Sequence, residues 1–399
     1  MTRGASSGWT ALAITLAIQA LVSMAVLTVP AMAPAMADTL GVSPTLIGAF
    51  VAILYVGAIG ASLLAGPLVM RFGAIRVSQG GLLICAAGLA VLAFVTWLPA
   101  TVFGALLVGA GYGPITPASS HLLAKTTPAH RMSLVFSIKQ TGVPLGGVLA
   151  GALVPALLLL GGTSAALLAV AAGNLLCAAI AQPLRGALDD DRDASKPVTF
   201  TSLAGPLRVV AAHRELSRLS SFSFVFSCVQ MCLAAYLVTF LHAALGYSLV
   251  AAGIVLSAAQ AGGVVGRVVW GYVADRWLDS RRVLALLALL MTLCSAGTAA
   301  LSAGAPVTLV VALAIAFGAS ATGWNGVFLA EVARLAPPGM ASAATGGALA
   351  VTFLGVVLGP ALFGALSGAF DSYRVGYLAL ALPTAVCCWR LLGTKETGK

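Results

Sequence analysis

Apolar runs long enough to cross a lipid bilayer recur along most of this 399-residue chain. A helix needs about 20 consecutive apolar residues to span the hydrocarbon core of a membrane. The composition agrees with this pattern, because 60% of the residues are hydrophobic and only 8% are charged. In a soluble globular protein, about a quarter of the residues carry a charge. The sequence therefore predicts an all-α integral membrane protein that crosses the bilayer many times.

We expect twelve transmembrane helices, with bounds placed to within about four residues. The predicted spans are 10–37, 44–70, 74–97, 99–124, 131–160, 163–185, 214–243, 247–275, 282–303, 306–335, 341–370 and 372–393. Span one lacks a small-residue cleavage site after a short apolar core, so we interpret it as a retained helix and not as a signal peptide. The segment 187–213 is the only long polar stretch. It is expected to link a six-helix bundle at 1–186 to a second bundle at 214–399.

Positive charge gathers on one side of this predicted topology, which we call the basic end. All but three of the 21 Lys and Arg residues fall at this end, and the opposite end has only Arg374 with Asp38 and Asp371. The positive-inside rule makes the basic end cytoplasmic and places both termini in the cytoplasm, as expected for a protein of the inner cell membrane. The net charge of +10 therefore reflects topology, and we expect no nucleic-acid partner. The linker also carries the acidic run Asp189-Asp190-Asp191-Arg192-Asp193, which we interpret as a solvated surface.

The two halves of the chain repeat one another's glycine pattern. Residues 66–73, after span two, correspond to the stretch from Gly271 to Arg276, after span eight; residues 142–147 in span five correspond to 355–360 in span eleven. Internal repeats of this kind are a feature of alternating-access transporters. The correspondence is incomplete, because Met70 occupies the position that Asp275 holds in the second half.

The pattern Gly271-x-x-x-Asp275-Arg276, the twelve spans, the central linker and the Gly-Pro-Gly-Gly-like stretch at 142–147 together resemble the major facilitator superfamily. The resemblance covers essentially the whole chain. It implies two pseudo-symmetric six-helix bundles, with spans 1, 4, 7 and 10 around a central cavity and spans 5 and 8 as neighbours. The departure at Met70 implies that the gating network of the first half is weaker or differently wired.

Lys139 and Arg267 are the only charged residues within the predicted spans and away from their ends. An arginine at the centre of a membrane helix costs about 3 kcal/mol on insertion scales, so each cation needs a partner or a task. No Asp or Glu lies in the middle of a span, and we therefore expect both cations to bind a carboxylate or a similar anion. The alternative is that Arg267 pairs with Asp275 or with helix ends, and that Lys139 extends to the membrane surface. In the repeat, Thr352 corresponds to Lys139 and Ser62 to Arg267, so each cation occurs in one half only.

The pair Arg267-x-x-x-Gly271 also looks like the eighth span of the monocarboxylate transporter and oxalate–formate antiporter families. In those families, the arginine one turn before the loop glycine contacts the substrate carboxylate, and the resemblance implies that role for Arg267. Their second cation lies in span one or eleven, where this chain has no charged residue but has uncharged polar ones, among them Gln19, Ser23, Thr345 and Thr352. Lys139 would replace that cation from span five.

Other polar and aromatic residues within the spans are candidates for lining the substrate cavity, with helix packing as the alternative for each. These candidates are Gln260, Trp324, Asn325, Tyr112, Gln230 and Tyr236. We assign gating roles to Asp275, Arg276, Arg71 and Glu331. Asp275 is expected to accept hydrogen bonds from a helix N-terminus or from a facing arginine.

These residues predict a secondary active transporter for a small organic anion, a monocarboxylate or similar acid, working by proton symport or anion exchange. The alternative is an efflux antiporter for a neutral or hydrophobic compound, because span five resembles an antiporter motif. We expect no enzyme, cofactor or metal site: the seven cysteines lie within spans, and the sequence has no catalytic triad, metal cluster or nucleotide-binding loop. The expected partners are a small-molecule substrate and the lipid bilayer, and we expect the chain to act as a monomer.

Overall fold

A computed structural model describes residues 3–41, 47–94, 97–196, 198 and 204–393 of the chain. All regular secondary structure in these ranges is helical, which confirms the predicted all-α class. The helices of the first half are α1 (Arg3–Ala31), α2 (Ala33–Leu40), α3 (Ile47–Phe72), α4 (Ala74–Phe94), α5 (Leu98–Tyr112), α6 (Ile115–Thr126), α7 (Met132–Gln140) and α8 (Gly142–Ala181). Two short helices follow: α9 (Arg185–Leu188) overlaps the start of the predicted linker, and α10 (Ala204–Ala212) lies within it. The second half contains α11 (Arg214–Leu245), α12 (Leu249–Arg276), α13 (Ser280–Ala300), α14 (Val307–Ala321), α15 (Asn325–Leu335), α16 (Ala341–Ala369) and α17 (Tyr373–Leu392).

Eleven helical segments of the described chain are long and apolar enough to cross a membrane. The longest of them, Ala129–Leu188, passes through Gly162, whose φ of 75° and ψ of −175° are not helical. Glycine adopts such a conformation without steric cost, so this segment supplies two spans and the total is the predicted twelve. The first span ends earlier than predicted, because the helix breaks at Met32 before Pro34.

Spans four and ten are each broken in the middle. In span four, α5 ends at Tyr112 and α6 begins at Ile115, on either side of Gly113-Pro114. In span ten, α14 ends at Ala321 and α15 begins at Asn325. A break inside a membrane helix frees backbone carbonyls, which then need donors from side chains.

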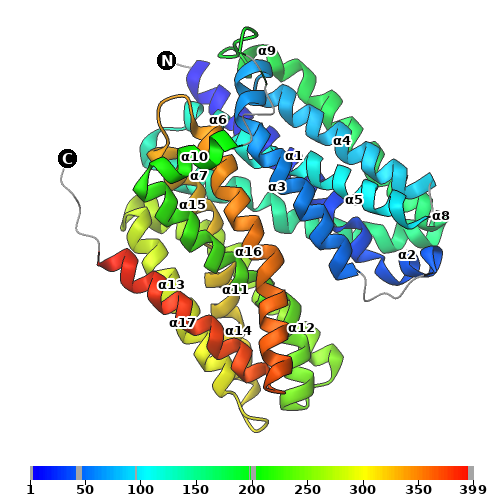
Figure 1. Cartoon of the computed structure of the whole chain (residues 1–399), viewed down its shortest axis with the longest axis vertical. Helices are drawn as coiled ribbons and strands as arrows, with labels where there is room; N and C mark the ends of the chain where they lie inside the picture. Colours follow the sequence, from blue (N-terminus) through cyan, green and yellow to red (C-terminus); the bar gives the residue numbers. More distant parts are fainter. Residues whose placement is uncertain (1–2, 42–46, 95–96, 197, 199–203, 394–399) are drawn as a thin grey trace. The chain divides into compact units, whose positions relative to one another are not determined.

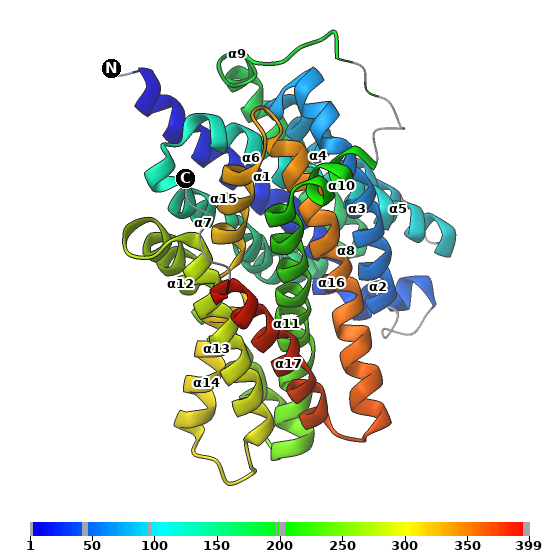
Figure 2. The ribbon, with the colours of Figure 1, turned by 60° about the vertical axis from the view of Figure 1, so that its left-hand side comes forward.

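The chain forms two compact units that do not follow the midpoint of the sequence. The first contains Met1–Pro128, Lys139–Ser217 and Val332–Ala350, and the second contains Ala129–Ile138, Arg218–Glu331 and Val351–Lys399. In the first unit, α1 packs along α8, and α4 packs along both α5 and α8 (Figure 1). In the second unit, α12 packs along α14, and α13 packs along α17 (Figure 2). The predicted domain bounds at residues 186 and 214 stay a prediction.

Matching glycines bring corresponding helices into close contact within each unit. A Cβ on Gly109 of α5 would overlap the carbonyl oxygen of Leu54, and a Cβ on Gly318 of α14 would overlap that of Ala259. These contacts join span four to span two and span ten to span eight. Small residues at such crossings let membrane helices approach backbone to backbone. The repeat seen in the sequence is therefore a repeat in helix packing.

Candidate functional site

Lys139 lies at the end of α7 and is buried, with only 1% of its surface exposed. Its Nζ donates to Gln19 Oε1 at 2.7 Å, to Thr116 Oγ1 at 3.1 Å and to Gln140 Oε1 at 3.1 Å. Thr116 Oγ1 donates to Gln19 Oε1 at 3.0 Å, and Gln19 Nε2 donates to Ser23 Oγ at 3.2 Å. An ammonium group has three donors and no acceptor. The acceptors in these three contacts are neutral oxygens.

This network connects α1 and α6 to Lys139 and Gln140, the last two residues of α7, within the first unit. Gln19 comes from α1, Thr116 from the start of α6 and Lys139 from α7. The break between α5 and α6 places Thr116 in the first turn of a new helix. The side chain of Lys139 therefore points into protein in this conformation and does not reach the membrane surface, the alternative left open by the sequence.

Arg267 lies on α12 and is equally buried, at 2% exposure. Its Nε donates to the carbonyl oxygen of Thr322 at 2.9 Å. Thr322 sits in the break between α14 and α15, where the carbonyls are not all used by the helix. One turn further along α12, Trp270 Nε1 donates to the carbonyl of Ala319 at 3.0 Å. The broken tenth span therefore anchors the buried face of α12.

Three of the predicted substrate residues, Arg267, Gln230 and Asn325, meet at this break. We call these three residues and Thr322 the span-ten cluster. Asn325 Nδ2 donates to Gln230 Oε1 at 3.1 Å and to the carbonyl of Thr322 at 3.4 Å. The carbonyl of Thr322 thus receives both Arg267 and Asn325. Thr322 was missed by the sequence interpretation, although the glycines on either side of Trp324-Asn325 mark the place where the helix breaks.

The other candidate substrate residues are more scattered. Trp324 is fully buried, donates from Nε1 to the carbonyl of Ala321 at 3.0 Å, and packs against Phe226 with ring centroids 5.6 Å apart. Protein encloses its ring in this conformation, so its role in substrate binding stays a prediction.

Two tyrosines and a glutamine complete the set of candidates. Tyr236 donates to the carbonyl of Pro360 at 2.8 Å and stacks on Phe363 at 4.5 Å. Tyr112 is half-buried and meets Tyr55 edge to face, with centroids 6.4 Å apart. Gln260 is exposed on α12. Substrate roles for these three residues also stay predictions.

Asp275 caps the start of α7. Its two carboxylate oxygens accept from the backbone N–H groups of Ser133 at 3.1 Å and Leu134 at 2.7 Å. A carboxylate at a helix N-terminus satisfies unpaired amides and interacts favourably with the helix dipole. Gly271 lies one turn before it, where a Cβ would come within 2.6 Å of Ser137 Cβ. The contact is of the kind expected for this residue, and its role in gating stays a prediction.

The three remaining gating candidates lie near the predicted basic end of their spans. Arg71 Nη1 donates to the carbonyl of Lys196 at 3.0 Å, and its guanidinium lies 5.6 Å from the centre of the Phe72 ring. Arg276 is exposed at the end of α12, and Glu331 is partly buried on α15. Gating roles for these three residues also stay predictions.

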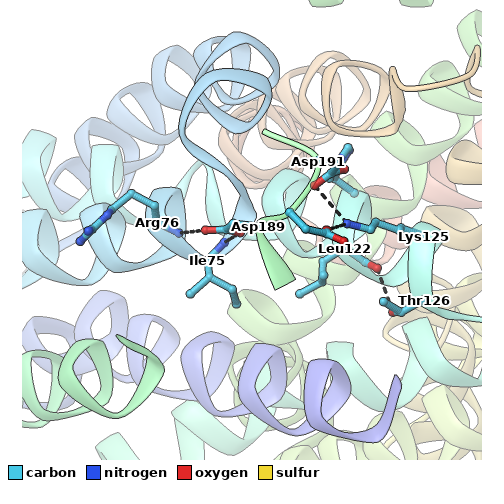
Figure 3. Close-up of polar contacts among 9 residues, drawn as sticks. Ile75, Arg76, Leu122, Lys125, Thr126, Asp189 and Asp191 are labelled. Atoms are coloured by element: carbon cyan, nitrogen blue, oxygen red, sulfur yellow. Dashed lines mark hydrogen bonds and ion pairs between the residues drawn. The ribbon is translucent and has the colours of Figure 1, made fainter. Parts of the chain in front are cut away.

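Within the acidic run of the linker, Asp189 is not on the solvated surface that the sequence suggested, whereas Asp190 and Asp191 are exposed. Asp189 is only 4% exposed, and its carboxylate accepts from the backbone N–H groups of Ile75 at 2.8 Å and Arg76 at 3.0 Å (Figure 3). Burial raises the pKa of the Asp189 carboxyl, and the two amides and the nearby Arg185 oppose that shift. The solvated interpretation was wrong for this residue because its partners lie more than a hundred positions away in the sequence.

Met70, which replaces the acid of the second half, lines an apolar cavity of about 280 Å³. Its other walls include Gly66 and Pro67 of α3, and Met340 and Ala343 at the start of α16. A Cβ on Gly66 would come within 2.9 Å of Ala343 Cβ, so the two helices nearly touch beside the cavity. Across the described residues, no three of His, Cys, Asp and Glu gather as a metal-ligand set.

Comparison with known proteins identifies relatives of the fold. The sequence model of the family described as Major Facilitator Superfamily matches residues 12–348. No curated protein sequence matches the chain.

Three solved structures resemble the chain over nearly its whole length. The fucose:proton symporter FucP of E. coli has a TM-score of 0.76 and 17% identity, over 98% of this chain and 100% of that one. The human organic anion transporter MFSD10 has a TM-score of 0.78 and 16% identity, over 96% and 99%. The proton:xylose symporter XylE has a TM-score of 0.77 and 15% identity, over 97% and 96%. These likenesses confirm the predicted fold of twelve transmembrane helices in two six-helix bundles.

Proposed function

This chain belongs to the major facilitator superfamily, and we propose that it moves a small organic anion, a monocarboxylate or a similar acid. It is a multi-pass membrane transporter by family and fold. In the proposal, transport runs by alternating access across the inner cell membrane, as proton symport or as anion exchange, with both termini in the cytoplasm and the monomer as the working unit.

The burial of two cationic side chains carries this proposal. Lys139 and Arg267 lie inside predicted membrane spans, and protein buries both, since they are only 1% and 2% exposed. Intramembrane cations are costly and commonly mark substrate or ion pathways. A carboxylate would supply negative charge to either site as well as hydrogen-bond acceptors.

The span-ten cluster supports a planar, hydrogen-bonding cargo. Arg267 and Asn325 both donate to the carbonyl of Thr322, and Asn325 also contacts Gln230. A guanidinium presents five N–H donors in a fixed fork that matches a carboxylate. The resemblance of Arg267-x-x-x-Gly271 to the monocarboxylate and oxalate–formate families favours the same role. In the first unit, Lys139 adds a point charge held among neutral oxygens.

The similar solved structures do not identify the substrate of this chain. They are an organic anion transporter, a fucose symporter and a xylose symporter. At 15–17% identity, similarity of structure reflects the fold, and a shared fold does not imply a shared cargo. The alternative, efflux of a neutral or hydrophobic compound, therefore needs a direct test.

A substrate screen on the purified protein tests the proposal. Small carboxylates and neutral solutes, including sugars, would be compared by thermal shift and by uptake into proteoliposomes. The variants are Arg267→Gln and Lys139→Gln, with Arg208→Gln, at an exposed arginine of α10, as the matched control for loss of a positive charge. We expect carboxylates to stabilise and enter, and we expect both responses to disappear in the two buried-site variants and to remain in the control. Equal responses to neutral solutes, unchanged in Arg267→Gln, would overturn the anion proposal in favour of the alternative.

A further inference from the structure

Helix α4, which is span three, begins without a cap from a neighbouring side chain in the sequence. Gly73 is the residue just before α4, and its φ of +93° is a conformation that side chains other than glycine rarely adopt. Asp189 from the linker supplies the missing acceptor for the amides of Ile75 and Arg76. A Cβ on Gly73 would overlap the carboxylate of Asp189. The glycine therefore both makes the turn and leaves the space that the linker carboxylate fills.

The next two acids of the linker contact α6. Asp191 Oδ2 lies 2.7 Å from His121 Nε2, and Asp191 Oδ1 lies 3.2 Å from Lys125 Nζ. Lys125 also pairs with Asp190. Burial alone would raise the pKa of Asp191, but His121 and Lys125 outweigh it and hold that pKa below its ordinary value. The contact with Lys125 is visible beside the Asp189 cap in Figure 3.

The end of the same segment is bound to the end of α3. The backbone N–H of Asp193 donates to the carbonyl of Met70 at 2.8 Å. Arg71 Nη1 donates to the carbonyl of Lys196 at 3.0 Å. Met70 and Lys196 also line the apolar cavity beside α16. One short stretch of linker thus touches the end of α3, the start of α4 and the side of α6.

We propose that residues 189–196 form a detachable strap, which holds the end of α3, the start of α4 and the side of α6 together and closes one wall of the cavity lined by Met70. The contacts belong to one cooperative element, because the Asp189 carboxylate, three ion pairs and two hydrogen bonds to backbone carbonyls all require the same docked conformation of the linker. The strap is detachable because none of these bonds belongs to the hydrogen-bond ladder of a transmembrane helix. Release of the strap exposes the amides of α4 and opens the cavity wall without unwinding a span.

This inference rests on contacts within the first unit and does not depend on the identity of the cargo. A test must therefore distinguish a cooperative strap from a local helix cap. The two possibilities differ in whether the hydrogen-exchange rates of amides that lie far apart in the sequence change together. If the strap is cooperative, removing one of its contacts should raise hydrogen exchange at the amides of Ile75, Arg76 and Asp193 together. In a local cap, the rise is confined to Ile75 and Arg76.

Residue-resolved hydrogen exchange of the full-length protein in nanodiscs measures this coupling. In Asp189→Asn, we expect exchange at the amides of Ile75, Arg76 and Asp193 to rise together by about tenfold, the size expected when a helix cap is lost. Asp189→Glu, which keeps the charge, should recover part of the protection. Asp279→Asn is the matched control, because Asp279 accepts from the amide of Arg282 at the start of α13. It should change exchange only there.

A second pair of variants reaches the strap from α6 and leaves the buried cap intact. His121→Gln and Lys125→Gln remove partners of Asp191 without touching α4. We expect each to raise exchange at Ile75 and Arg76 by about threefold, in keeping with partly exposed ion pairs. These variants also cover the case in which Asp189→Asn does not fold. If exchange at Ile75 and Arg76 is unchanged in both α6 variants, or if Asp189→Asn leaves the amide of Asp193 protected, the strap is overturned and Asp189 is a local cap.

Discussion

Spans five and eleven carry Lys139 and Thr352 at corresponding positions, and the two residues do different things. The ammonium of Lys139 is held by the side-chain oxygens of Gln19, Thr116 and Gln140. Thr352 packs its own helix against α11, with its hydroxyl 2.8 Å from Ser223 Oγ and its carbonyl 2.8 Å from Ser227 Oγ. The same position of the repeat thus carries a buried charged side chain in span five and an uncharged side chain that packs two helices together in span eleven.

The starts of spans three and nine differ in the same way. The turn into α13 is capped by Asp279, whose carboxylate accepts from Arg282, three residues away. The turn into α4 is capped by Asp189, which lies 114 positions from Ile75 in the sequence. Glycine contacts are kept in both halves, whereas charged groups are not. The repeat therefore describes how the helices pack, and the residues proposed here for substrate binding and for the strap lie at positions where the two halves differ.

Breaking the shared packing should have the largest effect, and an equal one in both halves. Gly109→Val and Gly318→Val each place a side chain against a backbone carbonyl that cannot move aside. We expect both to cost more than about 3 kcal/mol and to abolish folded protein. Size-exclusion profiles in detergent measure this outcome. Gly60→Ala and Gly253→Ala are the controls, since open space surrounds both glycines. A folded Gly318→Val beside an unfolded Gly109→Val would show that the halves do not share this contact.

Lys139 and Arg267 should contribute to substrate affinity, whereas Thr352 and Ser62, at the corresponding positions of the other half, should not. Arg267→Gln removes a charged donor to the carboxylate, at a cost of about 1.5–3 kcal/mol, or roughly a 10- to 100-fold loss of affinity. Ser62→Ala, at the corresponding position of span two, removes a hydroxyl that donates to the carbonyl of Ile59 at 2.8 Å. It should leave affinity unchanged. Titration of the best carboxylate from the screen measures both, and equal losses would remove the distinction between the halves.

The two capping acids should differ in their contribution to stability. Asp189→Ala removes a buried carboxylate that accepts from two amides, and we expect it to cost about 1–2 kcal/mol. Asp279→Ala removes an exposed cap with one amide partner, and it should cost about 0.5–1 kcal/mol. Denaturation midpoints in a single detergent rank the two variants. The reverse order would mean that the remote cap contributes less than the local one.

The ion pairs of the strap should have the smallest effect. The side chain of Asp191 is 37% exposed, and exposed ion pairs contribute only about 0–1 kcal/mol. Asp191→Asn should therefore change the midpoint slightly, and the difference from the wild type should shrink as salt is added. A large effect that is independent of salt would show that this pair is part of the buried cap.

The sequence predicted the class of fold well because length and hydrophobicity alone decide whether a helix can span a bilayer. The two breaks within spans were marked by Gly113-Pro114 and by the glycines around Trp324. The kink that separates spans five and six falls at Gly162, inside one continuous helical segment. Lys139 and Arg267 could be singled out because charge within an apolar run is rare.

The partners of these residues could not be predicted in the same way. Asp189 meets Ile75 through the folded chain, and nothing in the local pattern of the linker shows that contact. Thr322 escaped notice because its backbone carbonyl, and not its side chain, receives Arg267. Residue type gives no signal for a contact made by the backbone.

Recognition of a negatively charged cargo by buried positive charge can be measured with a matched pair of ligands. A carboxylate and its amide are nearly the same size and differ in charge. Equilibrium binding of both would be measured with the wild type, with Arg267→Gln and with Lys139→Gln. The account predicts at least a tenfold preference of the wild type for the carboxylate, the size of one charged hydrogen bond, and loss of that preference in each variant. Equal binding of the amide by the wild type, or a preference that survives in both variants, would contradict it.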